Sequence, residues 1–465
     1  MREGPEPKRP LLLAFYLPQF HPVPENDAWW GRGFTEWTNV VRARPLFAGH
    51  YQPHLPGELG FYDLRLPEVR EQQAALARDH GIDGFCYYHY WFGAGRRTLE
   101  RPFHEVLRTG SPDFPFCLAW ANENWTREWD AGDRSVLMPQ QYSDEDDEAH
   151  GRFLMEAFAD RRYIKVDGRP LFLVYRVQKL PDPKKTFGRW RQMAREHGFP
   201  DLYLIRFETH GDFRDPATFG CDASAEFLPH GVFEVLAPML PPGCNPGNAV
   251  FSYDDVARHF ATRDPVSWVR HPCVLPGWDN SPRQPDGKVV AITGTSVATY
   301  DWWLRRAIER AETEHPDQPI VFLNAWNEWA EGAHLEPDER NGRAYLEATL
   351  GALAWRGYAP RSGISGPPVS PASAEERYRE LYDQYVVLQR EHTAFLQTME
   401  RRVTQAVEPL ERELAQARHD AARLAGLVGE LREASSETAG PDRLRARLAR
   451  LRVSLGSGDR SGPDG

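Results

Sequence analysis

Eight short apolar runs recur along the chain, and helical patterns separate several of them. Most of the runs are continuously apolar, which is typical of strands that are covered on both faces. Strands that alternate with helices predict parallel pairing, and eight such units over roughly 350 residues predict an α/β fold of the (β/α)8 (TIM) barrel type. We expect the strands at Leu11–Phe20, Ile82–Phe92, Phe114–Trp125, Pro170–Arg176, Leu202–Glu208, Ala223–Pro229, Cys273–Trp278 and Ile320–Trp329.

The segments between these runs contain four clear helical patterns. They lie at Leu66–His80, Asp144–Arg161, Phe187–His197 and Ser296–His315, and Ser143 is a candidate N-cap for the second. A doubly wound open sheet is the alternative architecture. It is disfavoured because the residues after the first run, Leu17–Pro22, contain no glycine, so no phosphate-binding loop is visible there.

The chain of 465 residues changes character after Trp355. Pro360–Pro371 is rich in Pro, Gly and Ser, as linkers are. Apolar residues then recur at heptad spacing among charges, which predicts a coiled coil, with Pro409 interrupting it. A single amphipathic helix that packs on the barrel is the alternative. We therefore divide the chain into a disordered N-terminus (1–10), a barrel domain (11–358), a linker (359–372), a C-terminal helical coiled-coil tail (373–432) and a mostly disordered tail (433–465).

Composition excludes several classes of protein. The net charge of −11 gives no basic stripe for nucleic acid. The five cysteines are odd in number and lack C-x-x-C spacing, which argues against a disulfide framework and a zinc site. The first ten residues are polar, and no stretch reaches the ~20 apolar residues of a membrane helix. These patterns predict a cytoplasmic protein without cofactor that self-associates, or docks to a partner, through its coiled coil.

Aromatic, carboxylate, amide and imidazole side chains gather at the ends of all eight predicted strands. The carboxyl ends of barrel strands form the active site in this fold. Carboxylates and amides bind hydroxyl groups, and aromatic faces pack on sugar rings, so these ends predict a glycan-binding cleft. The expected substrate-binding residues are Tyr16, Gln19, His21, Glu36, Trp37, Tyr88, His89, Trp91, Trp120, Asn122, Glu123, Trp125, Glu208, Trp278, Asp279, Trp326, Asn327 and Trp329, and no metal ligands are expected.

Glu328 and Glu331 are the candidate catalytic pair, three residues apart at the end of the last predicted strand. If the turn after Trp326 is helical, their Cβ atoms lie ~5–6 Å apart on one face. Retaining glycosidases usually place two carboxyls on opposite sides of the sugar. A pair on one turn instead suits a reaction in which a hydroxyl of the substrate is the nucleophile: one glutamate deprotonates it, the other protonates the leaving oxygen, and repulsion raises one pKa. The alternatives are that both glutamates cap a helix and pair with arginines, or that Glu123 is the reactive carboxylate.

Five segments resemble the WbsX-like proteins of bacterial polysaccharide and O-antigen gene clusters. These segments are Ala14–Pro22, Gly33–Trp37, Gly84–Phe92, Trp120–Trp125 and Asn324–Gly332, and the resemblance covers residues 10–358. WbsX-like proteins are classed as glycosyltransferases and are related to the endo-α-mannosidases of glycoside hydrolase family 99. The resemblance implies a (β/α)8 barrel and retention through a 1,2-anhydro sugar. It assigns Glu328 as the base on the 2-hydroxyl and Glu331 as the general acid/base, whereas Ala330 departs from the histidine of the hydrolases.

Three functions follow as hypotheses. The first is a retaining enzyme that hydrolyses or transfers α-linked glycans during bacterial surface polysaccharide (O-antigen, lipopolysaccharide or capsule) synthesis. The second is a nucleotide-sugar-dependent glycosyltransferase, which the absence of a phosphate loop disfavours. The third is a noncatalytic glycan-binding protein with the coiled coil as its scaffold. The sequence leaves the sugar, the linkage and the acceptor open.

Overall fold

The computed structural model describes most of the N-terminal three quarters of the chain. The described residues are 8–126, 136–239, 241, 243–245, 247–284 and 289–360, followed by 409, 412–426, 428–429, 432, 442, 445–446 and 449–450. The chain divides into two compact units, Met1–Tyr378 and Arg379–Gly465. Each unit is therefore described by itself.

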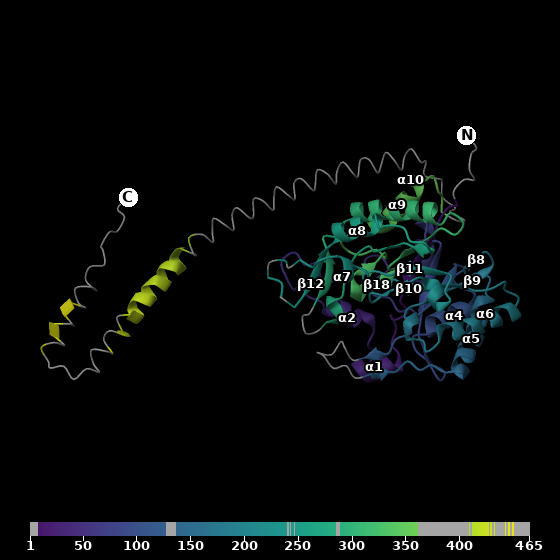
Figure 1. The fold of residues 1–465 in the computed structure, drawn as a ribbon, viewed down its shortest axis with the longest axis horizontal. Coiled ribbons are helices and arrows are strands. Elements are labelled where there is room, and N and C mark those ends of the chain that lie inside the picture. Colours follow the sequence, from purple (N-terminus) through teal and green to yellow (C-terminus); the bar gives the residue numbers. More distant parts are fainter. Residues whose placement is uncertain are drawn as a thin grey trace. The chain divides into compact units, whose positions relative to one another are not determined.

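Nine short parallel strands form the ring of the first unit (Figure 1). They are β1 (Leu11–Tyr16), β2 (Gly84–His89), β5 (Phe116–Trp120), β9 (Arg169–Val174), β10 (Tyr203–Glu208), β11 (Ala223–Glu226), β13 (Arg270–His271), β14 (Cys273–Val274) and β17 (Ile320–Leu323). Their order is β13-β11-β10-β9-β5-β2-β1-β17-β14. β13 pairs with β11 and β14 pairs with β17, and Pro272 alone separates β13 from β14.

β13 and β14 thus act as one interrupted strand that joins the two ends of the sheet. The ring then has the eight positions of a (β/α)8 barrel, and each predicted apolar run overlaps one of them, although the seventh run begins after β13 and the fourth begins one residue inside β9. The pairing of consecutive ring strands is parallel throughout, as the alternation with helices predicted. The open doubly wound sheet, which would leave both edges unpaired, is wrong.

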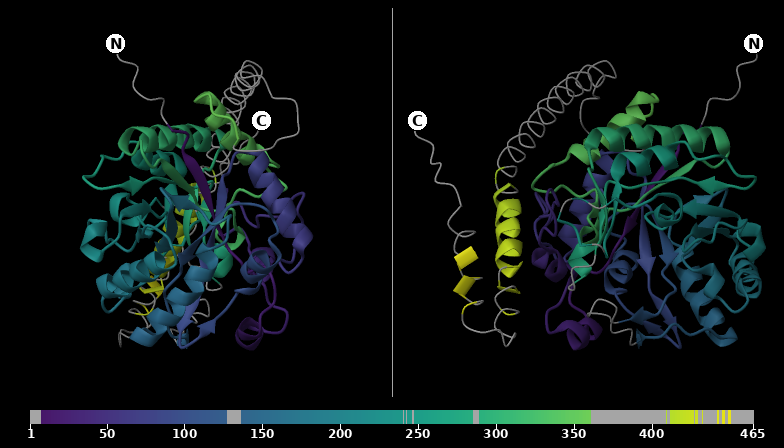
Figure 2. Two further views of the ribbon diagram at one scale, coloured as in Figure 1. Left: turned by 90° about the vertical axis from the view of Figure 1, so that its right-hand side faces the viewer. Right: turned by 60° about the vertical axis from the view of Figure 1, so that its left-hand side comes forward.

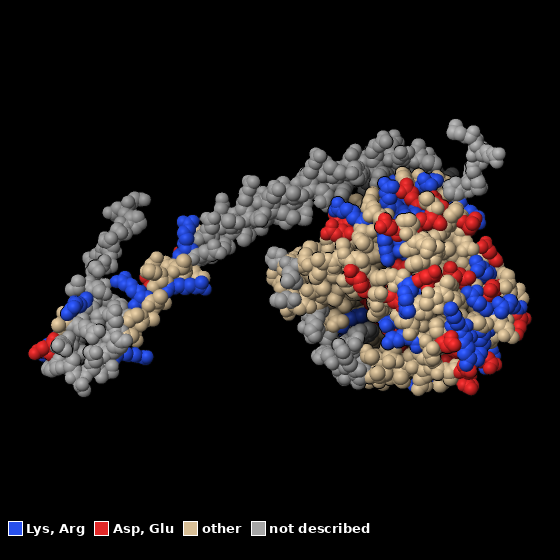
Figure 3. Space-filling view, in the orientation of Figure 1, with Lys and Arg blue, Asp and Glu red and all other residues tan. Residues whose placement is uncertain are grey.

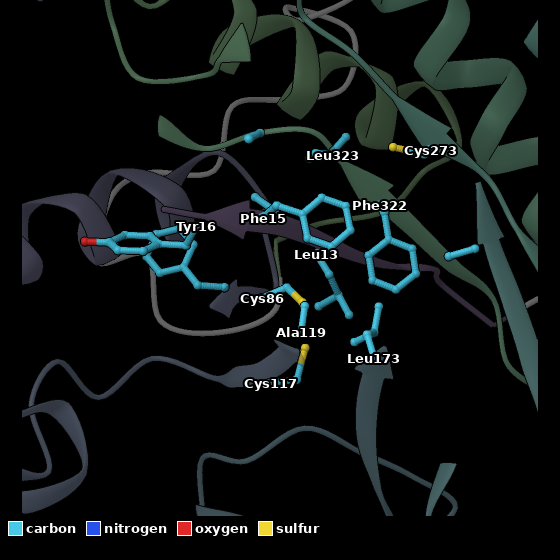
Figure 4. Close-up of a cluster of buried hydrophobic side chains, with 14 of the residues drawn as sticks. Leu13, Phe15, Tyr16, Cys86, Cys117, Ala119, Leu173, Cys273, Phe322 and Leu323 are labelled. Atoms are coloured by element: carbon cyan, nitrogen blue, oxygen red, sulfur yellow. The ribbon is translucent and has the colours of Figure 1, made fainter. Parts of the chain in front are cut away.

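Alternation along the strands decides which side chains fill the barrel. The ring of Phe15 on β1 contacts the rings of Tyr88, Phe207, Phe227 and Phe322, which come from β2, from β10, from just after β11 and from β17. Phe15 therefore points into the barrel, and its neighbours in the sequence point out. Figure 4 shows Leu13, Phe15, Leu173 and Phe322 together in this core.

Helices cover the outside of the ring, as Figures 1 and 2 show. The larger helices are α3 (Pro67–Asp79), α4 (Arg101–Thr109), α5 (Asp144–Phe158), α6 (Pro183–Glu196), α8 (Tyr253–Ala261), α9 (Val297–Glu314) and α10 (Ala344–Trp355). The four predicted helices correspond to α3, α5, α6 and α9, and the Ser143 Oγ accepts a hydrogen bond from the Asp146 N–H as an N-cap. Among the described residues, none of the helices is both long enough and apolar enough to cross a membrane.

Short elements in the connecting loops complete the fold. The short helices are α1 (Pro24–Trp30), α2 (Glu36–Arg42) and α7 (Val232–Val235). The short strands are β3 (Trp91–Gly93), β4 (Arg96–Arg97), β6 (Trp125–Thr126), β7 (Val136–Met138), β8 (Lys165–Val166), β12 (Ala249–Ser252), β15 (Trp278–Asp279), β16 (Val290–Thr293), β18 (Asn327–Glu328) and β19 (Ala333–His334). Four of the five cysteines are buried and all five are free thiols.

The predicted coiled coil at 373–432 lies mostly outside the described residues. Within it, residues 412–426 form a helix whose heptad side chains Leu414 and Leu424 are exposed. Most of the predicted linker at 359–372 and of the terminal segments 1–10 and 433–465 also lies outside them. Self-association through the tail therefore stays a prediction.

Candidate functional site

Three glutamates converge on the guanidinium of Arg283. Its Nη2 lies 2.8 Å from Glu328 Oε2 and 3.1 Å from Glu36 Oε2, and its Nη1 binds Glu331 Oε1. The Trp278 indole N–H donates to Glu331 Oε2 at 3.1 Å. Residues predicted at the first loop and at the seventh and eighth strand ends therefore meet at one place. Glu328 and Glu331 both pair with an arginine, as one part of the alternative expectation had it, and this arginine joins the two glutamates instead of separating them. Their catalytic role stays a prediction.

Local structure explains why Glu328 and Glu331 lie together. Glu328 ends β18, and a 3-10 turn at Trp329–Glu331 follows, so the turn is tighter than the α-helical one expected. Gly332 then adopts a left-handed conformation with φ of 58°, which favours glycine and turns the chain into β19. The turn carries both carboxylates to the same side of the hairpin.

The residues on either side of Glu328 anchor this turn to the barrel. The Asn327 amide accepts from the Leu17 N–H at 2.7 Å and donates to the Leu17 carbonyl at 3.0 Å. The Trp329 indole N–H donates to Glu336 Oε2 at 2.6 Å. Asn327 and Trp329, predicted to bind substrate, are thus buried with their polar atoms engaged inside the protein. They hold Glu328 and Glu331 in place.

Asp279 positions the loop that carries Arg283. Its carboxylate binds His50 Nε2 at 2.6 Å, accepts from the Gln52 amide at 2.7 Å and accepts from the Ser281 N–H at 2.9 Å. Burial alone would raise the pKa of Asp279, but these hydrogen bonds outweigh it and lower the pKa. The sequence predicted a hydroxyl-binding role for Asp279, and the structure places it as a buried partner of the loop.

Electrostatics make Glu328 the unusual carboxylate of the cluster. Burial raises its pKa to about 8, the charge of Arg283 opposes this rise, and repulsion from Glu331 and Glu36 adds to it. Burial also raises the pKa of Glu36. Burial would lower the pKa of Arg283, but the three carboxylates raise it well above its usual value. Like-charge repulsion was the expected cause of a raised pKa, and desolvation turns out to be the larger one.

Tyrosines surround the carboxylates on the barrel side. Burial and the charges of Glu328 and Glu331 raise the pKa of Tyr88, and burial and Glu328 do the same for Tyr90. Tyr90 contacts the half-buried ring of Trp125, with 5.3 Å between ring centroids. Figure 3 shows a hollow on this face, where Figure 1 labels α2 and β18. Tyr88 and Trp125 thus belong to the same end of the barrel as the carboxylates.

The ends of β5 and β9 are joined by a second polar group. Asn122 Oδ1 accepts from the Arg176 N–H at 2.7 Å, and its amide donates to the Arg176 carbonyl at 2.9 Å. Glu123 forms an ion pair with the Arg176 guanidinium, which also lies 3.1 Å from His210 Nε2. Asn122 is buried whereas Glu123 is half-buried, so Glu123 and Arg176 present charge at the barrel mouth. Glu123 does not join the Arg283 cluster.

Several predicted binding residues point away from the barrel interior. Alternation along each strand is the cause, since every second side chain faces the helices. Tyr16 donates to an amide on α3, Trp91 donates to Asp146 on α5, and Glu208 binds Arg263 at 3.0 Å. The remaining outward-facing members of the prediction are His89, which binds His150, and Trp120, which packs on α5 and α6.

Four other predicted residues are buried near the first loop and the eighth strand. Trp37 packs between Phe20 and Trp329, and Trp326 is fully buried. The backbone carbonyl of Gln19 accepts from the Glu36 N–H at 3.4 Å, and its side chain is buried. His21 is buried, which lowers its pKa to about 4, and its ring nitrogens have no hydrogen-bond partner among the described residues.

Arg283 is the main residue that sequence reasoning missed. It lies in a Pro-rich polar loop between predicted elements, where an arginine is ordinarily solvated. Sequence reasoning also missed a set of possible metal ligands, since it expected none. His54, His334 and Asp338 place one nitrogen or oxygen each within 4.8 Å of one another, a grouping that stands alone in the part of the chain that the structure describes. No spacing in the sequence reveals it, because His54 lies far from the other two.

Comparisons with known proteins place this barrel in a family. An endo-α-mannosidase of glycoside hydrolase family 99 from Bacteroides thetaiotaomicron aligns with 74% of this chain and 96% of its own, at a TM-score of 0.46 and 15% identity. The protein WxcX from two strains of Xanthomonas campestris pv. campestris is 44% identical over 352 residues, which cover 75% of this chain and 50% of WxcX. This chain therefore spans about half the length of these curated relatives. The family described as glycosyltransferase WbsX matches residues 12–349, and the chain belongs to that family.

Proposed function

We propose that this chain is a glycan-active enzyme that cleaves or transfers α-linked sugars with retention, and that Glu328 and Glu331 perform the chemistry. The observation that supports this proposal is the convergence of both carboxylates on Arg283 at the carboxyl ends of the barrel strands. This end of a (β/α)8 barrel is where active sites lie. Glu331 is the more open of the two, with its side chain 26% exposed against 7% for Glu328.

The proposed reaction uses the sugar's own 2-hydroxyl. Glu328 takes the proton of the 2-hydroxyl while the sugar's own 2-oxygen attacks C1. In the same step, Glu331 gives a proton to the departing glycosidic oxygen. The product of this step is a 1,2-anhydro sugar and a free aglycone. An acceptor hydroxyl then attacks C1 and loses its proton to Glu331, and the 2-oxygen recovers its proton from Glu328. Two inversions at C1 give net retention.

The electrostatics of the cluster suit these roles. A sugar hydroxyl is a weak acid, so removing its proton requires a strong base. Burial raises the pKa of Glu328 to about 8, which makes its carboxylate form a stronger base than an ordinary glutamate. Arg283 holds the three carboxyl groups together before substrate binds. Glu331 is reached from solvent and accepts a hydrogen bond from Trp278, which orients it toward the cleft. The resemblance of the Asn324–Gly332 segment assigns the base to Glu328 and the acid to Glu331. With a pKa of about 8, Glu328 acts as the base in its carboxylate form, whose share grows as the pH rises toward 8.

The acceptor and the pathway are further parts of the proposal. The family description names glycosyl transfer, which favours a sugar hydroxyl over water as acceptor. The resemblance to proteins of polysaccharide gene clusters favours a role in bacterial surface polysaccharide synthesis. A nucleotide-sugar donor is the second candidate, and the family description alone favours it. Free thiols at all five cysteines agree with the predicted cytoplasmic location.

The test is a screen of defined α-linked oligosaccharides and nucleotide sugars with wild-type protein, followed by Glu328→Gln and Glu331→Gln. Each variant should lose about 10²–10⁴-fold in kcat, because each removes a proton-transfer group, while glycan affinity stays measurable. Glu148→Gln, an exposed residue of α5, is the matched control. Full activity in both site variants would refute the proposal.

The two glutamates can also be told apart. An aryl glycoside with an acidic leaving group needs no protonation of the departing oxygen. Glu331→Gln should therefore recover bond cleavage on this substrate, whereas Glu328→Gln should not. Equal recovery in both variants would contradict the assigned roles, and a product formed only from a nucleotide sugar would favour the second candidate.

A further inference from the structure

Two histidines and an aspartate converge beside the turn that carries the catalytic glutamates. His54 Nδ1 lies 2.9 Å from His334 Nε2, and His334 Nε2 lies 3.9 Å from Asp338 Oδ2. These groups come from a loop after α2 and from the segment that begins at β19. His334 and Asp338 are buried and His54 is half-buried, so the three form a site with one side near solvent.

Hydrogen bonds outside the group orient its ligand atoms. His334 Nδ1 lies 3.1 Å from the Glu336 carbonyl, which can only accept, so Nδ1 carries the proton and Nε2 accepts from the His54 Nδ1–H. A bound ion would replace this hydrogen bond, and His54 would carry its proton on Nε2 instead. Asp338 accepts from the Asn341 backbone N–H at 2.5 Å and from its side-chain amide at 2.9 Å. Partners of this kind fix the tautomer and rotamer of metal-binding side chains.

Charge favours a cation at this position. Two imidazole nitrogens and one carboxylate oxygen face one another here, each within 4.8 Å of the others. A neutral nitrogen with a free lone pair is the form in which histidine binds metal.

We propose that His54, His334 and Asp338 bind one Zn²⁺ ion or a similar divalent transition-metal ion. Two imidazoles and one carboxylate are a zinc ligand set, which leaves a fourth position for water or substrate. Ligand atoms about 2.0–2.1 Å from a tetrahedral Zn²⁺ lie about 3.3 Å apart. The two rings would separate by a few tenths of an ångström, and Asp338 Oδ2 would approach His334 Nε2 by about 0.6 Å from its present 3.9 Å. The ligand atoms of His54 and Asp338, which lie within 4.8 Å of each other, would also draw together.

The proposed ion lies next to the catalytic turn. His334 pairs with Asn327 across the β18–β19 hairpin, and its ring stacks on Trp329 with 3.8 Å between centroids. Binding of the ion would therefore tie the hairpin that carries Glu328 and Glu331 to the loop at His54. This inference does not depend on the reaction that the glutamates catalyse.

The test uses the full chain after removal of metal with a chelator. Calorimetric titration with Zn²⁺ should show one tight site per chain, Co²⁺ should give the visible absorption of a tetrahedral site, and Zn²⁺ should raise the Tm. His54→Gln should weaken Zn²⁺ binding by about 100-fold or more, because it removes a ligand. The glutamine amide can still donate to His334 Nε2, so the fold is preserved.

Asp338→Asn is the second variant, and its Oδ1 can still accept from the Asn341 N–H. The matched control is His197→Gln, an exposed histidine after α6, which should bind Zn²⁺ as the wild type does. The Tm without metal shows whether each variant is folded, and either folded variant decides the question. Absence of a stoichiometric site in the wild type, or equal affinity in a folded variant and the wild type, would overturn the proposal.

Discussion

Glu328→Gln should make the protein more stable at high pH. The folded-state pKa of Glu328 is about 8, above its ordinary value of 4.5, so the folded state keeps a proton that the unfolded state releases. The stabilisation from this proton is complete below pH 4.5 and is lost as the pH rises through 8. Each pKa unit corresponds to 1.36 kcal/mol, so the loss is about 3 kcal/mol at pH 7 and about 5 kcal/mol above pH 8.

Denaturant unfolding of wild type and Glu328→Gln at pH 4.5, 7 and 9 measures this effect. Glutamine cannot ionise, so the free energy of unfolding of the variant, relative to wild type, should rise by about 3 kcal/mol between pH 4.5 and 7 and by about 5 kcal/mol by pH 9. Glu148→Gln removes an exposed carboxylate and should show no such trend. A difference between Glu328→Gln and wild type that stays constant with pH would refute the reasoning.

Three further predictions test other parts of the structure. Glu36→Gln removes a negative charge that raises the pKa of Glu328, so the acidic limb of the pH profile of kcat/KM should move to lower pH. A limb that stays in place or moves to higher pH would contradict the coupling between Glu36 and Glu328. Glu208→Gln should lower the free energy of unfolding by about 1–3 kcal/mol, because Arg263 loses a buried partner. If the variant instead binds substrate more weakly without any loss of stability, Glu208 does not face outward from the barrel. In equilibrium sedimentation the full chain should be larger than a chain that ends at residue 360, and monomers in both cases would rule out association through the tail.

The barrel could be predicted because most of its strands are buried and mostly apolar. The N-cap at Ser143 could be predicted for a similarly local reason, since its hydroxyl binds a backbone N–H three residues later. Local patterns also predicted that Glu328 and Glu331 share one turn. What these features have in common is that neighbouring residues alone determine them.

The direction of each strand-end side chain could not be predicted. Tyr88 faces the carboxylates while Trp120 faces the helices, and nothing in their composition distinguishes them. A one-residue shift in register would exchange such positions. Arg283 and His54 were missed because their contacts join segments far apart in the sequence, which only the folded loops bring together.

The central claim is that a hydroxyl of the substrate, positioned beside Glu328, is the nucleophile. The most direct measurement compares wild-type turnover of the preferred α-glycoside with turnover of the same compound lacking its 2-hydroxyl. The account predicts that the deoxy compound binds the cleft and is not turned over, because no oxygen can attack C1 from within the sugar. Turnover of both compounds at similar rates would contradict the account and would require a nucleophile from the protein or the solvent.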